Sequence, residues 1–324
     1  MRRVLTVLVK AAISALLLYL SLRSVNLGKV AKQLGGLDFR WITLVFFLLC
    51  IQMPLIAMRW REIVVICGAK LQLATALRYS FIGQFFSQVL PSTVGGDAVR
   101  IWLLARGGAG WPIATYSVLI DRVVGVSVLA ILVVACLPLT FTMIHDPIAR
   151  ATLALIGVGT LLGALFFLLL GIEHLRALER WWFTRHLAAA SHVAWRLCQS
   201  VSGIRVAMLS IAIHLMTVMA AWCAAVAAHA VIDFAHVLIL VLPVMLIATI
   251  PVSIAGWGVR ESAMVLAFSY AGLAESDGLI VSILFGAVSL AVGTIGGIVW
   301  VAGGFQWRSI KKFEMDTLEN DPSR

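Results

Sequence analysis

The chain has 324 residues, of which 62% are hydrophobic and only 12% charged, and its formal net charge is +10. A soluble domain averages about 25% charged residues. One water-soluble core cannot cover so much apolar surface, so the lipid bilayer must act as the solvent. The basic residues lie in short clusters between apolar runs rather than in one patch, which favours membrane topology and argues against nucleic-acid binding.

Six apolar runs are long enough to cross a bilayer, which requires about 20 residues. They cover roughly residues 4–22, 41–58, 115–139, 152–172, 206–232 and 279–304. The first run follows two arginines, as in a signal peptide. Because Lys10 interrupts it and no A-x-A cleavage site follows, we expect an uncleaved first span.

Two further apolar regions, residues 76–106 and 237–272, are interrupted in the middle. The first contains PSTVGGD, from Pro91 to Asp97, and the second contains PVSIAGWG, from Pro251 to Gly258. Proline ends a helix and glycine permits unusual turns, and each half is too short to cross alone. This pattern predicts two re-entrant helical hairpins.

The two interruptions resemble each other. Without gaps, Pro91, Gly96, Val99 and Arg100 align with Pro251, Gly256, Val259 and Arg260. An apolar span precedes each hairpin and another follows it. We therefore predict two repeats, at about residues 41–139 and 206–304, within one membrane domain that covers residues 1–305.

The basic residues predict the orientation. Arg2 and Arg3, the segments 59–78 and 173–205, and the polar tail 306–324 all fall on the cytoplasmic side if six spans cross, whereas the basic segment 23–40 opposes this arrangement. Both termini are then cytoplasmic, and the two hairpins enter from opposite faces. Inverted repeats with broken helices are typical of transporters. The prediction is an all-α polytopic membrane protein with about six full transmembrane helices and two re-entrant hairpins in an inverted repeat. Segment 173–205 is expected to form an amphipathic helix on the cytoplasmic surface.

Arg100 and Arg260 are the main candidate binding residues. Each follows a glycine turn and opens a half-helix, where a charge near the bilayer centre needs a partner or water. Two such arginines could hold a phosphate through bidentate hydrogen bonds, aided by the N-terminal dipoles of the half-helices. The alternative is that they extend to opposite surfaces as topology anchors.

Three acidic residues accompany these arginines. Asp97 lies three residues before Arg100 and could pair with it or cap the half-helix, and pairing is the favoured role. Glu261 is either a structural partner or a site for a coupling proton or cation. Asp121 and Arg122 lie inside a span, and each needs a partner on another element, with Arg59 a plausible neighbour. They either belong to the binding site or form an ion network that only stabilises the bundle.

Polar side chains along the first hairpin, among them Gln84 and Ser92, could bind a lipid headgroup or satisfy backbone groups freed by Pro91. The sequence contains no metalloprotease, nucleotide-binding or nucleophile-elbow motif, and the five cysteines form no C-x-x-C pair. We therefore predict no catalytic residues, no metal and no cofactor.

Four segments together resemble one family. They are RW at 59–60, LPSTVGGDAVR at 90–100, DR at 121–122 and PVSIAGWGVRE at 251–261. Over about residues 10–305 the chain resembles the flippase-like, or lysylphosphatidylglycerol synthase transmembrane-region, family. The residues that match its motif positions are Pro91, Gly95, Gly96, Asp97, Arg100, Asp121, Arg122, Pro251, Gly256, Gly258, Arg260 and Glu261. The family often has asparagines where this chain has Ser87 and Gln88, so specific contacts from those two positions do not carry over.

The resemblance implies a lipid-translocating domain without the soluble aminoacyl-transferase domain of full-length synthases. The leading hypothesis is a lipid flippase or transporter, not an enzyme, that moves an anionic phospholipid or a polyprenyl- or hopanoid-type lipid across the bacterial inner membrane. A membrane transferase is the alternative, although no D-x-D motif is present. The third hypothesis is a non-transporting scaffold for a lipid-modifying enzyme.

Overall fold

The computed structural model describes residues 12, 14–23, 25, 27–90, 94–171, 182–250 and 256–303, and this part of the chain is helical without strands. The helices are α2 (Leu27–Gly35), α3 (Phe39–Ile66), α4 (Leu73–Val89), α5 (Gly95–Leu104), the π-helical turn η1 (Ala105–Ala109), α6 (Trp111–Met143), α7 (Pro147–Leu169), α8 (Trp182–Cys198), α9 (Val201–Ala227), α10 (Phe234–Ala248), α11 (Val259–Tyr270) and α12 (Glu275–Ala302). A further short apolar helix covers Ser14–Arg23.

Five described helices are long and apolar enough to cross a membrane, namely α3, α6, α7, α9 and α12. They correspond to the last five predicted runs, so the chain is a polytopic, all-helical membrane protein. The first predicted run is only partly described, by Ser14–Arg23. The predicted end of the second span at residue 58 was too early, because α3 continues through Arg59 to Ile66. Arg59 does not end the helix since Asp121 neutralises its charge inside the protein.

Both interrupted regions consist of two short helices. The pairs are α4 with α5 and α10 with α11, and the members of each pair pack against each other. Pro91 and Pro251, which were predicted to break them, lie outside the described residues. The second turn shows why glycine is required, because Gly256 and Gly258 have φ angles of 81° and 89°, a region that side chains with a Cβ rarely adopt.

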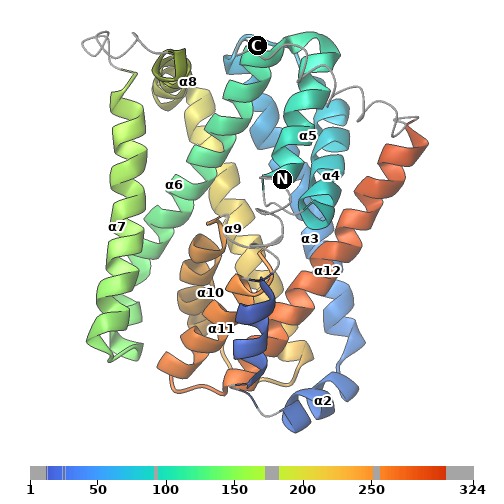
Figure 1. Ribbon diagram of the computed structural model, residues 1–324, viewed down its shortest axis with the longest axis vertical. Coiled ribbons are helices and arrows are strands. Elements are labelled where there is room, and N and C mark those ends of the chain that lie inside the picture. The colour runs from blue at the N-terminus through green and yellow to red at the C-terminus, as the bar shows by residue number, and fades with distance from the viewer. Residues whose placement is uncertain are drawn as a thin grey trace.

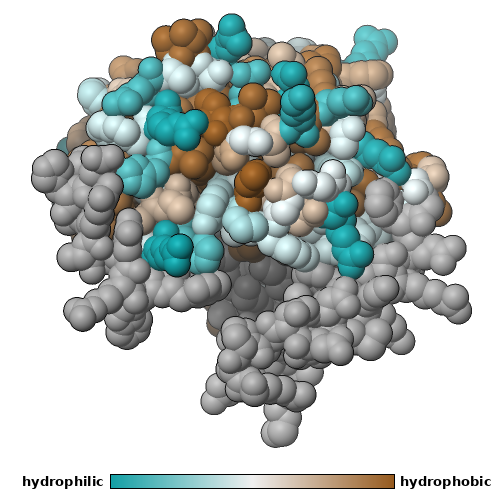
Figure 2. Space-filling view, turned by 90° about the horizontal axis from the view of Figure 1, so that it is seen from above, coloured by the Kyte–Doolittle hydropathy of each residue, from teal (hydrophilic) through white to brown (hydrophobic). Residues whose placement is uncertain are grey.

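The two hairpins lie at opposite ends of the molecule (Figure 1), with the α4–α5 pair near the upper end and the α10–α11 pair near the lower end. Helix α8 lies across the upper end, and α2 lies at the lower end. Thus α8 shares an end with the first hairpin, and the basic segment that opposed the predicted orientation lies at the other end. Figure 2 looks onto the upper end, where polar and apolar side chains are mixed.

The helix contacts of the two predicted repeats are equivalent. Helix α4 packs on α12 as α10 packs on α6, and α5 packs on α6 as α11 packs on α12. Likewise α3 contacts α6 and α12, while α9 contacts α12 and α6, and α3 packs along α9. If α3, α4, α5 and α6 are exchanged for α9, α10, α11 and α12, the same set of helix contacts results. Two repeats related by a two-fold pseudo-axis require this.

Close approach of α12 and α4 depends on Gly296. A Cβ atom at Gly296 would overlap the carbonyl oxygen of Phe81 on α4, whereas one at Gly163 on α7 would meet nothing within 4 Å. Glycine at a helix crossing lets two backbones approach closely in a membrane, where packing drives helix association. The contact between the first hairpin and the second repeat therefore rests on this small residue.

Replacing Gly296 with alanine should destabilise the protein by about 1–3 kcal/mol, the usual cost of overpacking a close contact. Gly163→Ala is the matched control and should leave stability unchanged or slightly raised, because alanine favours the helix. Thermal unfolding of the purified proteins in detergent measures the difference. Equal melting temperatures for the two variants would contradict this account of the crossing.

Candidate functional site

The first hairpin places Arg100 against α4 through two glycines. A Cβ at Gly96 on α5 would overlap the carbonyl oxygen of Gly83 and the hydroxyl of Ser87 on α4. At Gly83, a Cβ would lie 2.8 Å from Cγ of Arg100. The two half-helices thus cross at glycines, and the space left by the missing side chains holds the stem of Arg100.

A cavity of about 230 Å³ lies beside this crossing. Its charged lining residues are Arg59 from α3, Asp97 and Arg100 from α5, and Asp121 and Arg122 from α6. The other lining residues include Ser80, Gly83, Gln84, Ser87, Gly96, Gly125, His214 and Thr249. Five charged side chains from three helices, between residues 59 and 122, therefore meet around one cavity.

Asp121 joins two of the arginines. One carboxylate oxygen accepts a hydrogen bond from Nε of Arg59 at 2.9 Å, and the other accepts one from Nη2 of Arg100 at 3.1 Å. The Asp121 side chain is only 2% exposed. Charge-assisted hydrogen bonds of this kind are among the strongest in proteins, so Asp121 fixes both guanidinium groups. The predicted neighbourhood of Arg59 and Asp121 is confirmed.

Asp97 links Arg100 to the third arginine, Arg122. It lies 3.5 Å from Nη1 of Arg100 and accepts a hydrogen bond of 2.5 Å from Nε of Arg122. The predicted pairing of Asp97 with Arg100 is confirmed, whereas the N-cap position of α5 is Val94 rather than Asp97. Asp97 lies inside the first turn, where its charge also favours the helix N-terminus.

The charged residues around the cavity do not cancel. Three guanidinium groups face two carboxylates, which leaves one net positive charge among the described lining residues. The side chain of Arg122 is 49% exposed, while those of Arg59 and Arg100 are about nine-tenths buried. The surplus charge thus belongs to a largely buried cluster, where water screens it poorly and an anion would be attracted.

Two buried polar atoms in this cavity have no hydrogen-bond partner among the described residues. They are Nε of Arg100 and Oγ of Ser80. The residues are 7% and 3% exposed, and an unsatisfied buried group costs about 1–3 kcal/mol or more when charged. A ligand oxygen or an ordered water near these atoms would satisfy them. The Arg100 guanidinium is further held by the Trp60 ring, whose centroid lies 4.2 Å from Cζ.

Several cavity residues were not predicted. Ser80, Gln84 and Ser87 follow a spacing of four and three on α4 and so share one helix face, but only Gln84 was selected as a binding residue. His214 also lines the cavity, where Nε2 lies 2.9 Å from the carbonyl oxygen of Gly125. No spacing pattern links His214 to the hairpin, because the contact is formed between repeats.

Arg260 and Glu261 form a second cluster, and neither is among the described residues that line the cavity. Oε1 of Glu261 accepts hydrogen bonds from Arg260 at 2.7 Å and from Ser282 at 2.8 Å, while Oε2 accepts one from the Gly258 N–H at 2.7 Å. Nε of Arg260 donates to Ser282 at 2.9 Å. The cluster is locally neutral, and Glu261 closes the glycine turn before α11.

The other candidate residues have simpler placements. Gln84 lines the cavity, Gly95 is the first residue of α5, and Ser92 lies outside the described residues. In the described part of the chain, no group of three or more His, Cys, Asp or Glu side chains is placed to hold a metal ion. The geometry therefore supports binding by guanidinium and hydroxyl groups.

Removal of the Asp121 charge should destabilise the fold strongly. Asp121→Asn leaves Arg59 and Arg100 without their shared carboxylate, and breaking a buried ion pair typically costs about 3–5 kcal/mol. Glu62→Gln provides a control, because its pair with Arg61 is longer, at 3.5 Å, and partly exposed, so its loss should cost less than about 1 kcal/mol. Chemical unfolding in detergent compares the variants, and similar losses for both would contradict a bridging role for Asp121.

The comparisons with known proteins agree with this structure. No curated protein matches the chain. The family described as the lysylphosphatidylglycerol synthase TM region matches residues 7–297. This range includes both charged clusters and all the membrane-crossing helices apart from the last residues of α12. The chain belongs to the lysylphosphatidylglycerol synthase transmembrane-region family.

Proposed function

We propose that the protein is a lipid flippase or transporter that moves an anionic lipid across the bacterial inner membrane, with both termini in the cytoplasm. The observation that carries this proposal is the unpaired Nε–H of Arg100, which lies buried in a cavity with one surplus positive charge. A phosphate oxygen would satisfy that donor, and the hydroxyl of Ser80 could donate to a second oxygen.

The charged cavity would lower the main free-energy barrier to lipid translocation, which is the transfer of the anionic headgroup through the apolar layer. An unpaired anion in a dry, apolar medium costs tens of kcal/mol. Fixed guanidinium groups replace the lost water, and because Asp121 and Asp97 already hold them in place, little ordering is needed when an anion binds. A phosphate headgroup would thus cross the apolar layer inside a site that is charged in advance.

The size of the cavity limits what it can hold. At about 230 Å³ it is smaller than most pockets for whole organic ligands, which range from about 300 to 1,000 Å³. It can admit a phosphate with a small substituent, while the hydrocarbon chains must stay outside. This division suits a lipid whose headgroup enters the protein and whose chains remain among apolar surfaces.

The arrangement of repeats suggests how the site could face each side in turn. In the described conformation Arg100 faces the cavity, while Arg260 is held by Glu261 and Ser282. We assign the first phosphate contact to Arg100. Rocking of one repeat against the other would open the second hairpin, and Arg260 would receive the phosphate there.

A binding role is favoured over chemistry at this site. Asp97, Asp121 and Glu261, the embedded carboxylates, are each engaged by guanidinium groups. A carboxylate whose oxygens already accept these hydrogen bonds is not placed to take a proton from a substrate. The transferase and scaffold hypotheses both predict that the purified protein alone does not move lipid.

Arg100→Gln should reduce transport of phosphatidylglycerol by roughly tenfold or more, because a charge-assisted hydrogen bond worth about 1.5–3 kcal/mol is lost. The variant with both Arg100→Gln and Arg260→Gln should be at least as impaired. The measurement is the loss of fluorescence of phosphatidylglycerol labelled on one acyl chain in proteoliposomes after an impermeant quencher is added. Phosphatidylcholine labelled in the same way, which keeps the phosphate but has no net charge and a bulkier headgroup, is the comparison.

The control is Arg205→Gln, which removes an exposed positive charge at the start of α9. It should transport normally and so account for any general effect of surface charge. Melting temperatures confirm that each variant is folded, and Arg100→Lys, which keeps the charge, should retain more activity than Arg100→Gln. Normal transport by the folded double variant would exclude the arginine mechanism.

A further inference from the structure

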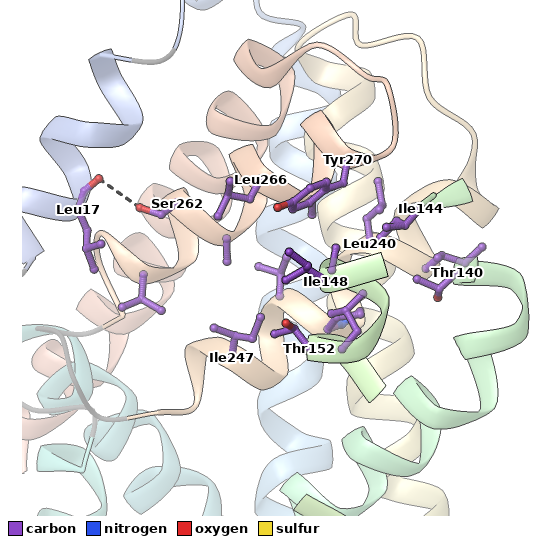
Figure 3. A pocket seen from close by; sticks show the side chains of 18 residues that line it. Leu17, Thr140, Ile144, Ile148, Thr152, Leu240, Ile247, Ser262, Leu266 and Tyr270 are labelled. Carbon is purple, nitrogen blue, oxygen red and sulfur yellow. Dashed lines mark hydrogen bonds between the residues drawn. The ribbon is translucent and has the colours of Figure 1, made fainter. Parts of the chain in front are cut away.

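An apolar groove of about 380 Å³ lies on the second hairpin, away from the charged cluster. Its walls are the corner between α6 and α7, helices α10 and α11, and the helix Ser14–Arg23 (Figure 3). Leu240 and Ile247 of α10 face Leu266 of α11 across it. The groove is thus formed by three separate parts of the chain, and packing between them has left it unfilled.

The groove offers almost no hydrogen-bonding groups. Ser262, one of its few polar residues, already donates to the carbonyl oxygen of Leu17 at 3.2 Å and is bonded to Ser21. Ile148 and Leu266, which line the groove, are 74% and 55% exposed in the protein, and in a membrane-spanning chain this surface suits hydrocarbon. The occupant must therefore be apolar.

The length of the groove fits one leaflet of the bilayer. It follows α11 from Val259 to Tyr270, which at about 1.5 Å per residue is roughly 16 Å. The hydrocarbon core of a bilayer is about 30 Å thick, so this is close to half of it. Tyr270 lies at the end of α11 near the molecular end, where tyrosine is favoured at the membrane interface.

The groove and the charged cavity share two helices. Ile247, near the end of α10, lines the groove, and Thr249, which caps this helix, lines the cavity. On α6, Thr140 lines the groove and Leu129 lines the cavity. The apolar and charged sites therefore follow one another along the same helix pair, in the order of the two parts of a lipid.

From this order we infer that the groove binds a single hydrocarbon chain of the transported lipid while its phosphate contacts Arg100. The inference rests on the proposed function and adds to it, because it assigns the chain to the second hairpin and the headgroup to the first. Shape sets the substrate class, namely a lipid with at least one long, flexible acyl or prenyl chain attached to a phosphate.

The test uses the full-length protein in vesicles that contain phosphatidylglycerol with a photoreactive diazirine near the end of one acyl chain. After irradiation, mass spectrometry locates the adducts. Ala267 lines the groove, and Ala267→Phe should lower adducts on groove residues roughly fivefold or more, because the added ring occupies the space of the chain. Ala151→Phe, at an exposed position of α7 outside the groove, should leave them unchanged.

Ala263→Leu, a smaller change on the same wall, serves if Ala267→Phe does not fold. If Ala267→Phe or Ala263→Leu is folded and its groove residues are labelled as strongly as in the unmodified protein, the inference is wrong. It is also wrong if native mass spectrometry shows a bound polypeptide instead of lipid. Arg100→Gln separates the two proposals, since it should reduce transport roughly tenfold or more yet keep the groove adducts. Transport that survives Arg100→Gln while filling the groove removes the adducts would refute the arginine mechanism alone.

Discussion

The bridge from Asp121 to Arg59 and Arg100 is the interaction on which the rest of the structure depends. It connects α3, α5 and α6 inside the membrane domain, where no single one of these charges would be stable alone. With Arg100 held in place in this way, its Nε–H is buried without a hydrogen-bond partner in the wall of the cavity. Stability of the first repeat and readiness to bind an anion therefore have the same physical origin.

Local rules of helix geometry account for what the sequence could predict. Apolar runs indicated the long helices. Glycines near Gly96 and Gly256 indicated the breaks, because a single glycine can permit a backbone turn that other residues rarely adopt. The three-residue spacing of Asp97 and Arg100 sufficed to predict their pairing. Helix ends were less accurate, since Arg59 was taken for a span boundary and its buried partner depends on tertiary structure.

Contacts between distant elements explain what the sequence could not predict. The alignment of Arg100 with Arg260 suggested equivalent environments, yet one arginine lines a cavity and the other is neutralised within its own turn. Ser80 was not predicted because a serine on a helix often only donates to a carbonyl oxygen of the preceding turn, as Ser127 and Ser210 do. Only the assembled helices show that its hydroxyl is buried without a partner and that it shares a cavity with Arg100.

The helix after each hairpin supplies a partner to the hairpin arginine, but the two partners differ in charge. Asp121 follows Arg100 by 21 residues and Ser282 follows Arg260 by 22. A carboxylate and a hydroxyl in matching places give the two halves unequal electrostatic energies. The two halves of the molecule are therefore electrostatically unequal even though their helices pack in the same pattern.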